Sequence, residues 1–131
     1  MKQLALATVL IAPPAAAWAC DIPQDWTVMK ARQPGIVIAA VKLPELPIQT
    51  GTLFDIDVMI CADEVNALDL HFDALMPAHK HGINYRPEIE DLANGQFRVS
   101  GLFFHMPGQW QFTMDLNAKS QQDFYLDVAA R

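Results

Sequence analysis

Apolar and polar residues alternate along much of the chain after residue 35. The clearest run is 52–61, in which one face carries Phe54, Ile56, Val58 and Ile60. Residues 65–74 repeat the pattern, with an apolar face of Leu68, Leu70 and Phe72. A period of two residues is that of a β-strand with one buried face, so each run predicts a strand. We expect 65–74 to pair with 52–61 as a hairpin.

Further segments of the chain fit the same period. They are residues 35–43, 97–105, 110–116 and 124–128. Pro44 and Pro47 exclude a central strand directly after the first of these, because proline cannot donate to a strand ladder. No stretch of ten or more residues has a convincing helical period. About seven short strands in roughly 110 residues predict an all-β protein, an immunoglobulin-like antiparallel β-sandwich.

The first nineteen residues differ from the rest. Lys2 precedes an apolar stretch, two prolines interrupt that stretch, and Ala17-Trp18-Ala19 has small residues in the positions that signal peptidase requires. A membrane anchor would need about 18 uninterrupted apolar residues. We therefore expect a signal peptide over 1–19, cleaved after Ala19, an N-terminal arm over 20–34, a β-sandwich domain over 35–131, and export to the periplasm.

Cys20 and Cys61 are the two cysteines of the chain. In an exported protein such a pair predicts a disulfide, here between the arm and the body. Closing a loop of about forty residues stabilises the fold by about 3 to 4 kcal/mol in the chain-entropy model. Two alternatives stay open, namely two thiolate metal ligands and lipidation of Cys20. The first lacks a Cys-x-x-Cys spacing, and the second lacks the usual leucine at position 17.

Charge and residue content argue against several functions. The net charge is −6, and it becomes −7 without residues 1–19, because Lys2 is the only charge there. Basic residues are scattered among fifteen acidic ones, so we expect no nucleic-acid binding. Ser100 and Ser120 do not lie in a nucleophile elbow, and no carboxylate pair suited to acid–base catalysis is evident. We expect a protein that is not an enzyme.

Two segments combine histidine, methionine and proline at the ends of predicted strands. The first contains Met76, His79 and His81, and the second contains His105 and Met106. Residues two apart in an extended chain project to the same side, so the first two histidines can converge on one ion. Imidazole with thioether favours copper, particularly Cu(I), whereas zinc gains little from methionine. If the loops meet, all five side chains are candidate metal ligands.

Other interpretations of the same residues are ordinary. Pro107-Gly108 is a common turn sequence, and methionine often fills protein cores. His71 lies between Asp69 and Asp73 on an outward face, where a surface histidine paired weakly with acids is the simpler interpretation. Trp110 is interpreted as a core aromatic near the second segment.

Three segments of the chain together carry a resemblance to a known family. They are the string from Asp73 to Gly82, the Gly-Gln-Phe run beginning at Gly95, and the string from Phe104 to Trp110. In these segments the chain resembles the YtkA-like and FixH-like domain family. The resemblance extends over about residues 41–128. It implies an exported β-sandwich related to cupredoxin-like and CopC-like copper-carrying domains, with roles in copper handling or assembly of respiratory oxidases. His79, His81 and Met106 match the family pattern. FixH-like members usually keep a membrane anchor, which this sequence does not show.

The sequence thus predicts a periplasmic metal-binding protein for copper carriage, tolerance or delivery to a respiratory or redox enzyme. The expected partners are the metal ion and a periplasmic or membrane redox protein. One alternative is an interaction module without metal, in which the two Met-Pro segments only shape loops. Another is a metal-dependent redox enzyme, which would need an open coordination position.

Overall fold

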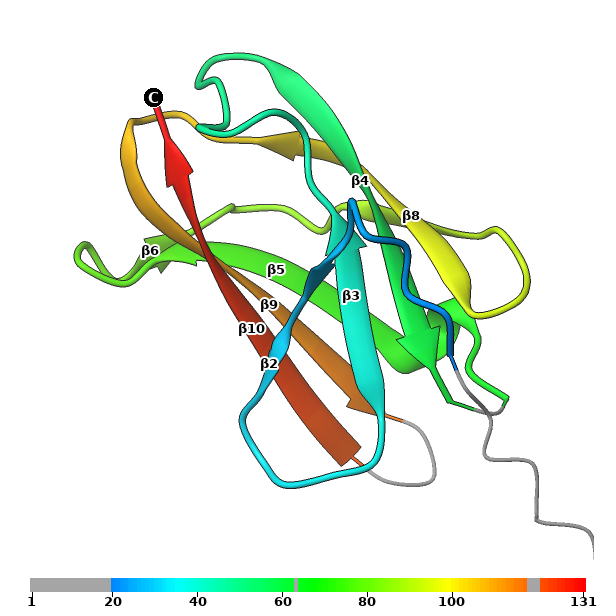
Figure 1. The fold of residues 1–131 in the computed structure, drawn as a ribbon. Helices are drawn as coiled ribbons and strands as arrows, with labels where there is room; N and C mark the ends of the chain where they lie inside the picture. The colour runs from blue at the N-terminus through cyan, green and yellow to red at the C-terminus, as the bar shows by residue number, and fades with distance from the viewer. Residues whose placement is uncertain (1–19, 63, 118–120) are drawn as a thin grey trace, which may run out of the picture.

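The computed structural model describes residues 20–62, 64–117 and 121–131 (Figure 1). The expected signal peptide, 1–19, lies outside these residues. The described strands are β1 (Thr27–Val28), β2 (Lys30–Ala31), β3 (Ile38–Lys42), β4 (Leu53–Cys61), β5 (Leu70–Met76), β6 (His81–Gly82), β7 (Glu88–Asp91), β8 (Gln96–Phe103), β9 (Gly108–Asn117) and β10 (Gln121–Ala130). A single 3-10 turn, η1 (Ala67–Asp69), completes the elements of this part of the chain.

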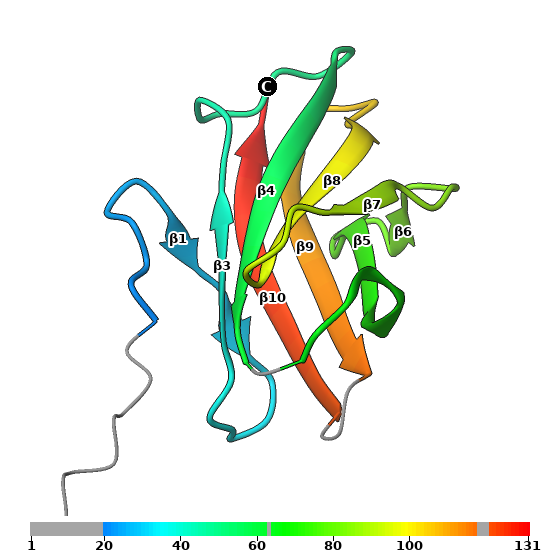
Figure 2. The same cartoon turned by 90° about the vertical axis from the view of Figure 1, so that its right-hand side faces the viewer.

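The strands form two antiparallel sheets of five strands each. Sheet A has the order β1-β3-β4-β8-β7, and sheet B has the order β2-β10-β9-β5-β6. Figure 2 shows the two layers, with β3, β4 and β8 lying in front of β9 and β10. This arrangement confirms the predicted all-β, immunoglobulin-like sandwich. Seven of the strands in the described ranges have four or more residues, which agrees with the expected number.

The core lies between the sheets and is rich in aromatic side chains. Its largest fully buried members include Trp110, Phe97, Phe104, Phe112 and Phe124. Trp110, Phe112 and Phe124 are buried because every second residue of β9 and β10 points to the other sheet. In β8 the same alternation buries Phe97 and Val99 and is interrupted at Ser100 and Gly101. Burial of such side chains supplies most of the free energy that holds two sheets together.

One polar residue is enclosed with the core. Gln122 is 4% exposed, and its Nε2 amide has no hydrogen-bond partner among the described residues. The amide packs against Gly35 so closely that a Cβ there would overlap it. Buried donors are normally paired, so Gln122 is a weak point of the core.

The prediction for residues 65–74 is wrong in two respects. β5 begins at Leu70, and Leu68 is 96% exposed instead of buried. The side chain of Asn66 accepts from the Leu68 N–H and the Asp69 carboxylate accepts from the Asn66 N–H, both at 3.0 Å. This capping box forms η1 and turns Leu68 outward.

The expected hairpin between 52–61 and 65–74 is also absent from the described residues. β4 pairs with β3 and β8 in sheet A, whereas β5 pairs with β9 and β6 in sheet B. The chain therefore crosses from one sheet to the other between these strands. Alternation specifies which face of a strand is buried, but it does not specify the partner strand.

The N-terminal arm contributes to both sheets. β1 pairs with β3, β2 pairs with β10, and Met29 between them is buried. The predicted disulfide between Cys20 and Cys61 is present, with a Cα–Cα distance of 5.7 Å. The arm is therefore attached to the body by two short ladders and one covalent bond.

Candidate metal centre

A short hairpin between β5 and β6 carries three of the candidate ligands, Met76, His79 and His81. Met76 at the end of β5 is paired with His81 at the start of β6. Between them, the backbone N–H groups of His79 and Lys80 both donate to the Met76 carbonyl, at 3.1 and 2.9 Å. Lys80 has a φ of +53°, the left-handed conformation that closes this turn. The tight turn keeps both histidines within a few residues of the strand end.

The connection between β8 and β9 carries the third histidine. Its start is held by a hydrogen bond of 2.9 Å from the Gly51 N–H to the Phe104 carbonyl. Its end is held by a hydrogen bond of 3.0 Å from the Trp110 indole N–H to the Met106 carbonyl. His105 lies between these two anchors, so its backbone position is well determined.

The two segments meet in space. The ring centroids of His79 and His81 are 5.6 Å apart, and those of His81 and His105 are 5.2 Å apart. We refer to these three residues as the histidine cluster. His81 occupies its centre and is half-buried, whereas His79 and His105 are exposed. The sequence predicted that these three histidines share a site, and the structure brings their rings near one another from positions more than twenty residues apart.

Trp110 lies beneath the histidine cluster and packs against two of its rings. Its side chain is fully buried and stacks on Phe104, with ring centroids 4.3 Å apart and planes 9° from parallel. The imidazoles of His81 and His105 contact it edge to face, at centroid distances of 6.2 and 5.4 Å. The expectation that Trp110 is a core aromatic is confirmed. The structure adds that Trp110 packs against two of the three rings of the cluster.

The two candidate methionines have different surroundings. Met76 is 2% exposed and belongs to the core cluster, and its methyl group reaches the backbone at Gly108, where a Cβ would come within 2.8 Å. Met106 is only partly buried and lies on the same connection as His105. Met106 is therefore the better placed of the two thioethers for reaching a bound ion.

The separations in the cluster suit shared coordination by pairs of rings. Two imidazoles that bind one tetrahedral ion through nitrogens about 2.0 Å from it have ring centres about 5 Å apart. As positioned, however, no three His, Cys, Asp or Glu side chains of the described ranges form a complete ligand set. A full set requires rotation of side chains, which exposed histidines undergo within nanoseconds.

The remaining candidates lie elsewhere. His71 faces Asp115 on β9, with 3.5 Å between Nδ1 and Oδ2, and both side chains are about half exposed. This agrees with a surface histidine paired weakly with an acid. Cys20 and Cys61 are joined in the disulfide, so the alternative of two thiolate metal ligands is wrong.

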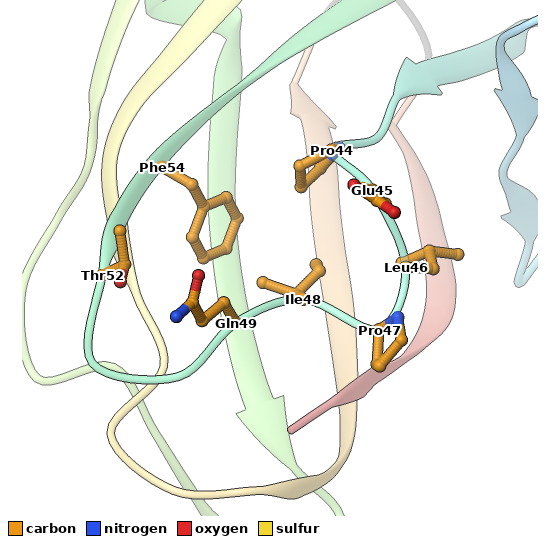
Figure 3. Close-up of a pocket in the computed structure, with 8 residues that line it drawn as sticks. All are labelled: Pro44, Glu45, Leu46, Pro47, Ile48, Gln49, Thr52 and Phe54. Atoms are coloured by element: carbon orange, nitrogen blue, oxygen red, sulfur yellow. The ribbon is translucent and has the colours of Figure 1, made fainter.

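A pocket that the sequence did not predict lies in the loop between β3 and β4 (Figure 3), and this loop is hydrogen-bonded through Gly51 to Phe104, the neighbour of His105. Its volume is about 330 Å³, and it is lined by Pro44, Glu45, Leu46, Pro47, Ile48, Gln49, Thr52 and Phe54. The loop between β3 and β4 curves around Ile48 and the Phe54 ring, and the Leu46-Pro47 peptide bond in it is cis. The only sequence signal was the Leu-Pro-Glu-Leu-Pro run, which marked a loop and no cavity.

Tyr85 lies beside Phe103 of β8. Partial burial raises the pKa of Tyr85 above its ordinary value, and a hydrogen bond with the Phe103 backbone offsets part of that rise. The loop that follows β6 is therefore packed against the end of β8.

No helix within the described ranges is long and apolar enough to cross a membrane. Comparison of the chain with protein-family models, curated proteins and solved structures gives no match. The function is therefore inferred from the residues and geometry of the chain itself.

Proposed function

We propose that this protein binds one copper ion at the histidine cluster and carries it in an oxidising compartment. The observation that carries the proposal is the run of ring contacts from His79 to His81 and from His81 to His105, with His81 and His105 both packed on the buried Trp110. Solitary surface histidines have no reason to gather from two separate loops. Imidazole pairs at the separations of His79–His81 and His81–His105 can share a late first-row metal ion once their side chains rotate into place.

The donor chemistry favours copper over zinc. Met106 is the nearest partly exposed thioether along the chain, and thioether ligands select Cu(I). The outer side stays open because His79 and His105 are exposed, so an ion can be transferred to a partner. Carriage needs this access and requires no turnover.

The surroundings agree with a carrier outside the cytoplasm. The Cys20–Cys61 disulfide indicates an oxidising environment. The signal peptide expected over 1–19 would place the protein in the periplasm, and the acidic charge of the chain attracts cations. The resemblance to YtkA-like and FixH-like domains supports delivery of copper to a respiratory or redox enzyme.

The deciding experiment measures Cu(I) binding by competition with a chromophoric chelator, together with metal content after dialysis. The variant is His79→Ala with His81→Ala, and the matched control is His71→Ala, which removes a histidine outside the cluster. We expect one tightly bound copper in the parent and in the control, and at least a tenfold weaker affinity in the double variant. Far-UV circular dichroism verifies that all three proteins are folded.

Other outcomes would overturn this assignment. Equal copper binding by parent and double variant would place the ion elsewhere, and no copper binding at all would leave a metal-free interaction module as the leading account. Stoichiometric zinc with weak copper would change the identity of the ion. Measurable turnover of a redox substrate would show an enzyme instead of a carrier.

A further inference from the structure

The pocket beside the histidine cluster has a preformed shape. Its loop is bound to the last described strand, with hydrogen bonds of 2.9 Å from the Ile48 N–H to the Ala129 carbonyl and from the Arg131 N–H to the Ile48 carbonyl. It is also bound to the β8–β9 connection through the hydrogen bond from Gly51 to Phe104. Anchoring on both sides means that an occupant pays little entropy to order the loop.

The pocket has an apolar floor and one charged wall. Ile48 is buried, the Phe54 ring is half-buried, and Leu46 is 52% exposed at the rim. Figure 3 shows the Ile48 side chain and the Phe54 ring on the inner side of the loop. Its volume of about 330 Å³ lies at the lower end of the range for ligand sites. That space accommodates one large apolar side chain.

Glu45 is the charged group of the pocket. It is exposed, and among the described residues it has no ion pair or hydrogen bond. The chain as a whole is acidic, with a net charge of −6. Charge complementarity therefore selects a ligand with a positive charge beside its apolar group.

The position of the pocket indicates what kind of ligand it serves. Phe54 contacts Phe104 edge to face at a centroid distance of 5.1 Å, and Phe104 stacks on Trp110 below the histidine cluster. An occupant therefore lies at the end of the sandwich from which His105 projects. We infer that the pocket anchors a partner polypeptide by one apolar side chain flanked by lysine or arginine. This inference does not rest on metal binding.

The test uses two-dimensional NMR titration of the purified, isotope-labelled protein with short capped peptides. The probe is acetyl-Ala-Phe-Arg-Ala-amide, and the comparison peptides replace its arginine by glutamate or its phenylalanine by alanine. Phenethylammonium tests whether a small amine suffices. We expect the probe to shift the amide signals of Leu46, Ile48 and Gln49, and both comparison peptides to bind more weakly.

Matched variants separate the pocket from general charge attraction. Glu45→Gln should lower the affinity for the probe peptide about two- to fivefold, which is the range for loss of an exposed ion pair. Glu88→Gln, which removes an exposed acid on β7, should leave binding unchanged. The His79→Ala, His81→Ala variant should still bind the probe, so failure of the metal site and failure of the pocket are distinguishable.

Three results would overturn the inference. The pocket signals could remain unshifted by the probe, the glutamate peptide could bind as well as the arginine peptide, or Glu88→Gln could weaken binding as much as Glu45→Gln. Binding of phenethylammonium without binding of the peptide would assign the pocket to a small amine and so reject a polypeptide partner.

Discussion

Replacing Gln122 by methionine should stabilise the protein. Gln122 is 4% exposed, and its Nε2 amide lacks a partner among the described residues. A buried donor without a partner costs about 1 to 3 kcal/mol. Methionine has nearly the same length, fills irregular space well, and carries no donor. Allowing for imperfect repacking, we expect Gln122→Met to raise the free energy of unfolding by about 1 to 2 kcal/mol.

The assay is urea denaturation at equilibrium with the disulfide intact, monitored by tryptophan fluorescence. The change corresponds to a rise of roughly 4 to 9 °C in Tm for a domain of this size. Gln121→Met is the matched control, because Gln121 is the exposed neighbour on the same strand, and it should change stability by less than about 0.5 kcal/mol. A loss of stability in Gln122→Met, or an equal gain in the control, would refute the reasoning.

Three further predictions concern other parts of the molecule. Replacing both cysteines by serine removes the disulfide between residues separated by 41 positions, so the unfolded chain gains conformational entropy. The free energy of unfolding should fall by about 4 kcal/mol in denaturant titrations. Trp110→Phe removes the hydrogen bond to the Met106 carbonyl and should destabilise the fold by about 2 kcal/mol, and it should also weaken copper binding in the chelator competition. The Tyr125→Phe variant removes the other tyrosine, so a titration of phenolate absorbance in it measures the pKa of Tyr85. That pKa should lie above 10.0 because burial disfavours the phenolate. Since the unfolded chain then loses its proton first, the Tyr85 contribution to stability should decline as pH rises past 10.

The alternation in the sequence predicted the bounds of three long strands well. β4, β8 and β9 begin and end within a few residues of the expected positions, because apolar residues recur at every second position over most of each strand. The prediction was wrong at Leu68, where a capping box of only four residues outweighed the apolar pattern. It was wrong for the pairing of β5 because strand partners are chosen by packing across the whole sandwich.

The site was predictable in its residue types but not in its surroundings. Histidines spaced two apart next to a strand end indicated a shared centre, and their rings do lie side by side. Nothing local in the sequence indicated that Trp110 would lie beneath them, or that Met76 would be enclosed while Met106 stays partly open. The pocket around Glu45 depends on anchoring of its loop to β10 and to Phe104, contacts that span more than fifty residues.

The pairing of β2 with β10 has a consequence for how the protein folds. Lys30 lies opposite Tyr125, so this ladder joins segments of the chain that lie 95 residues apart. Contacts this distant in sequence form late and slow the search for the native state. β2 therefore joins sheet B after β10 has taken its place in that sheet. This order leaves the N-terminal arm accessible while the rest of the sandwich assembles.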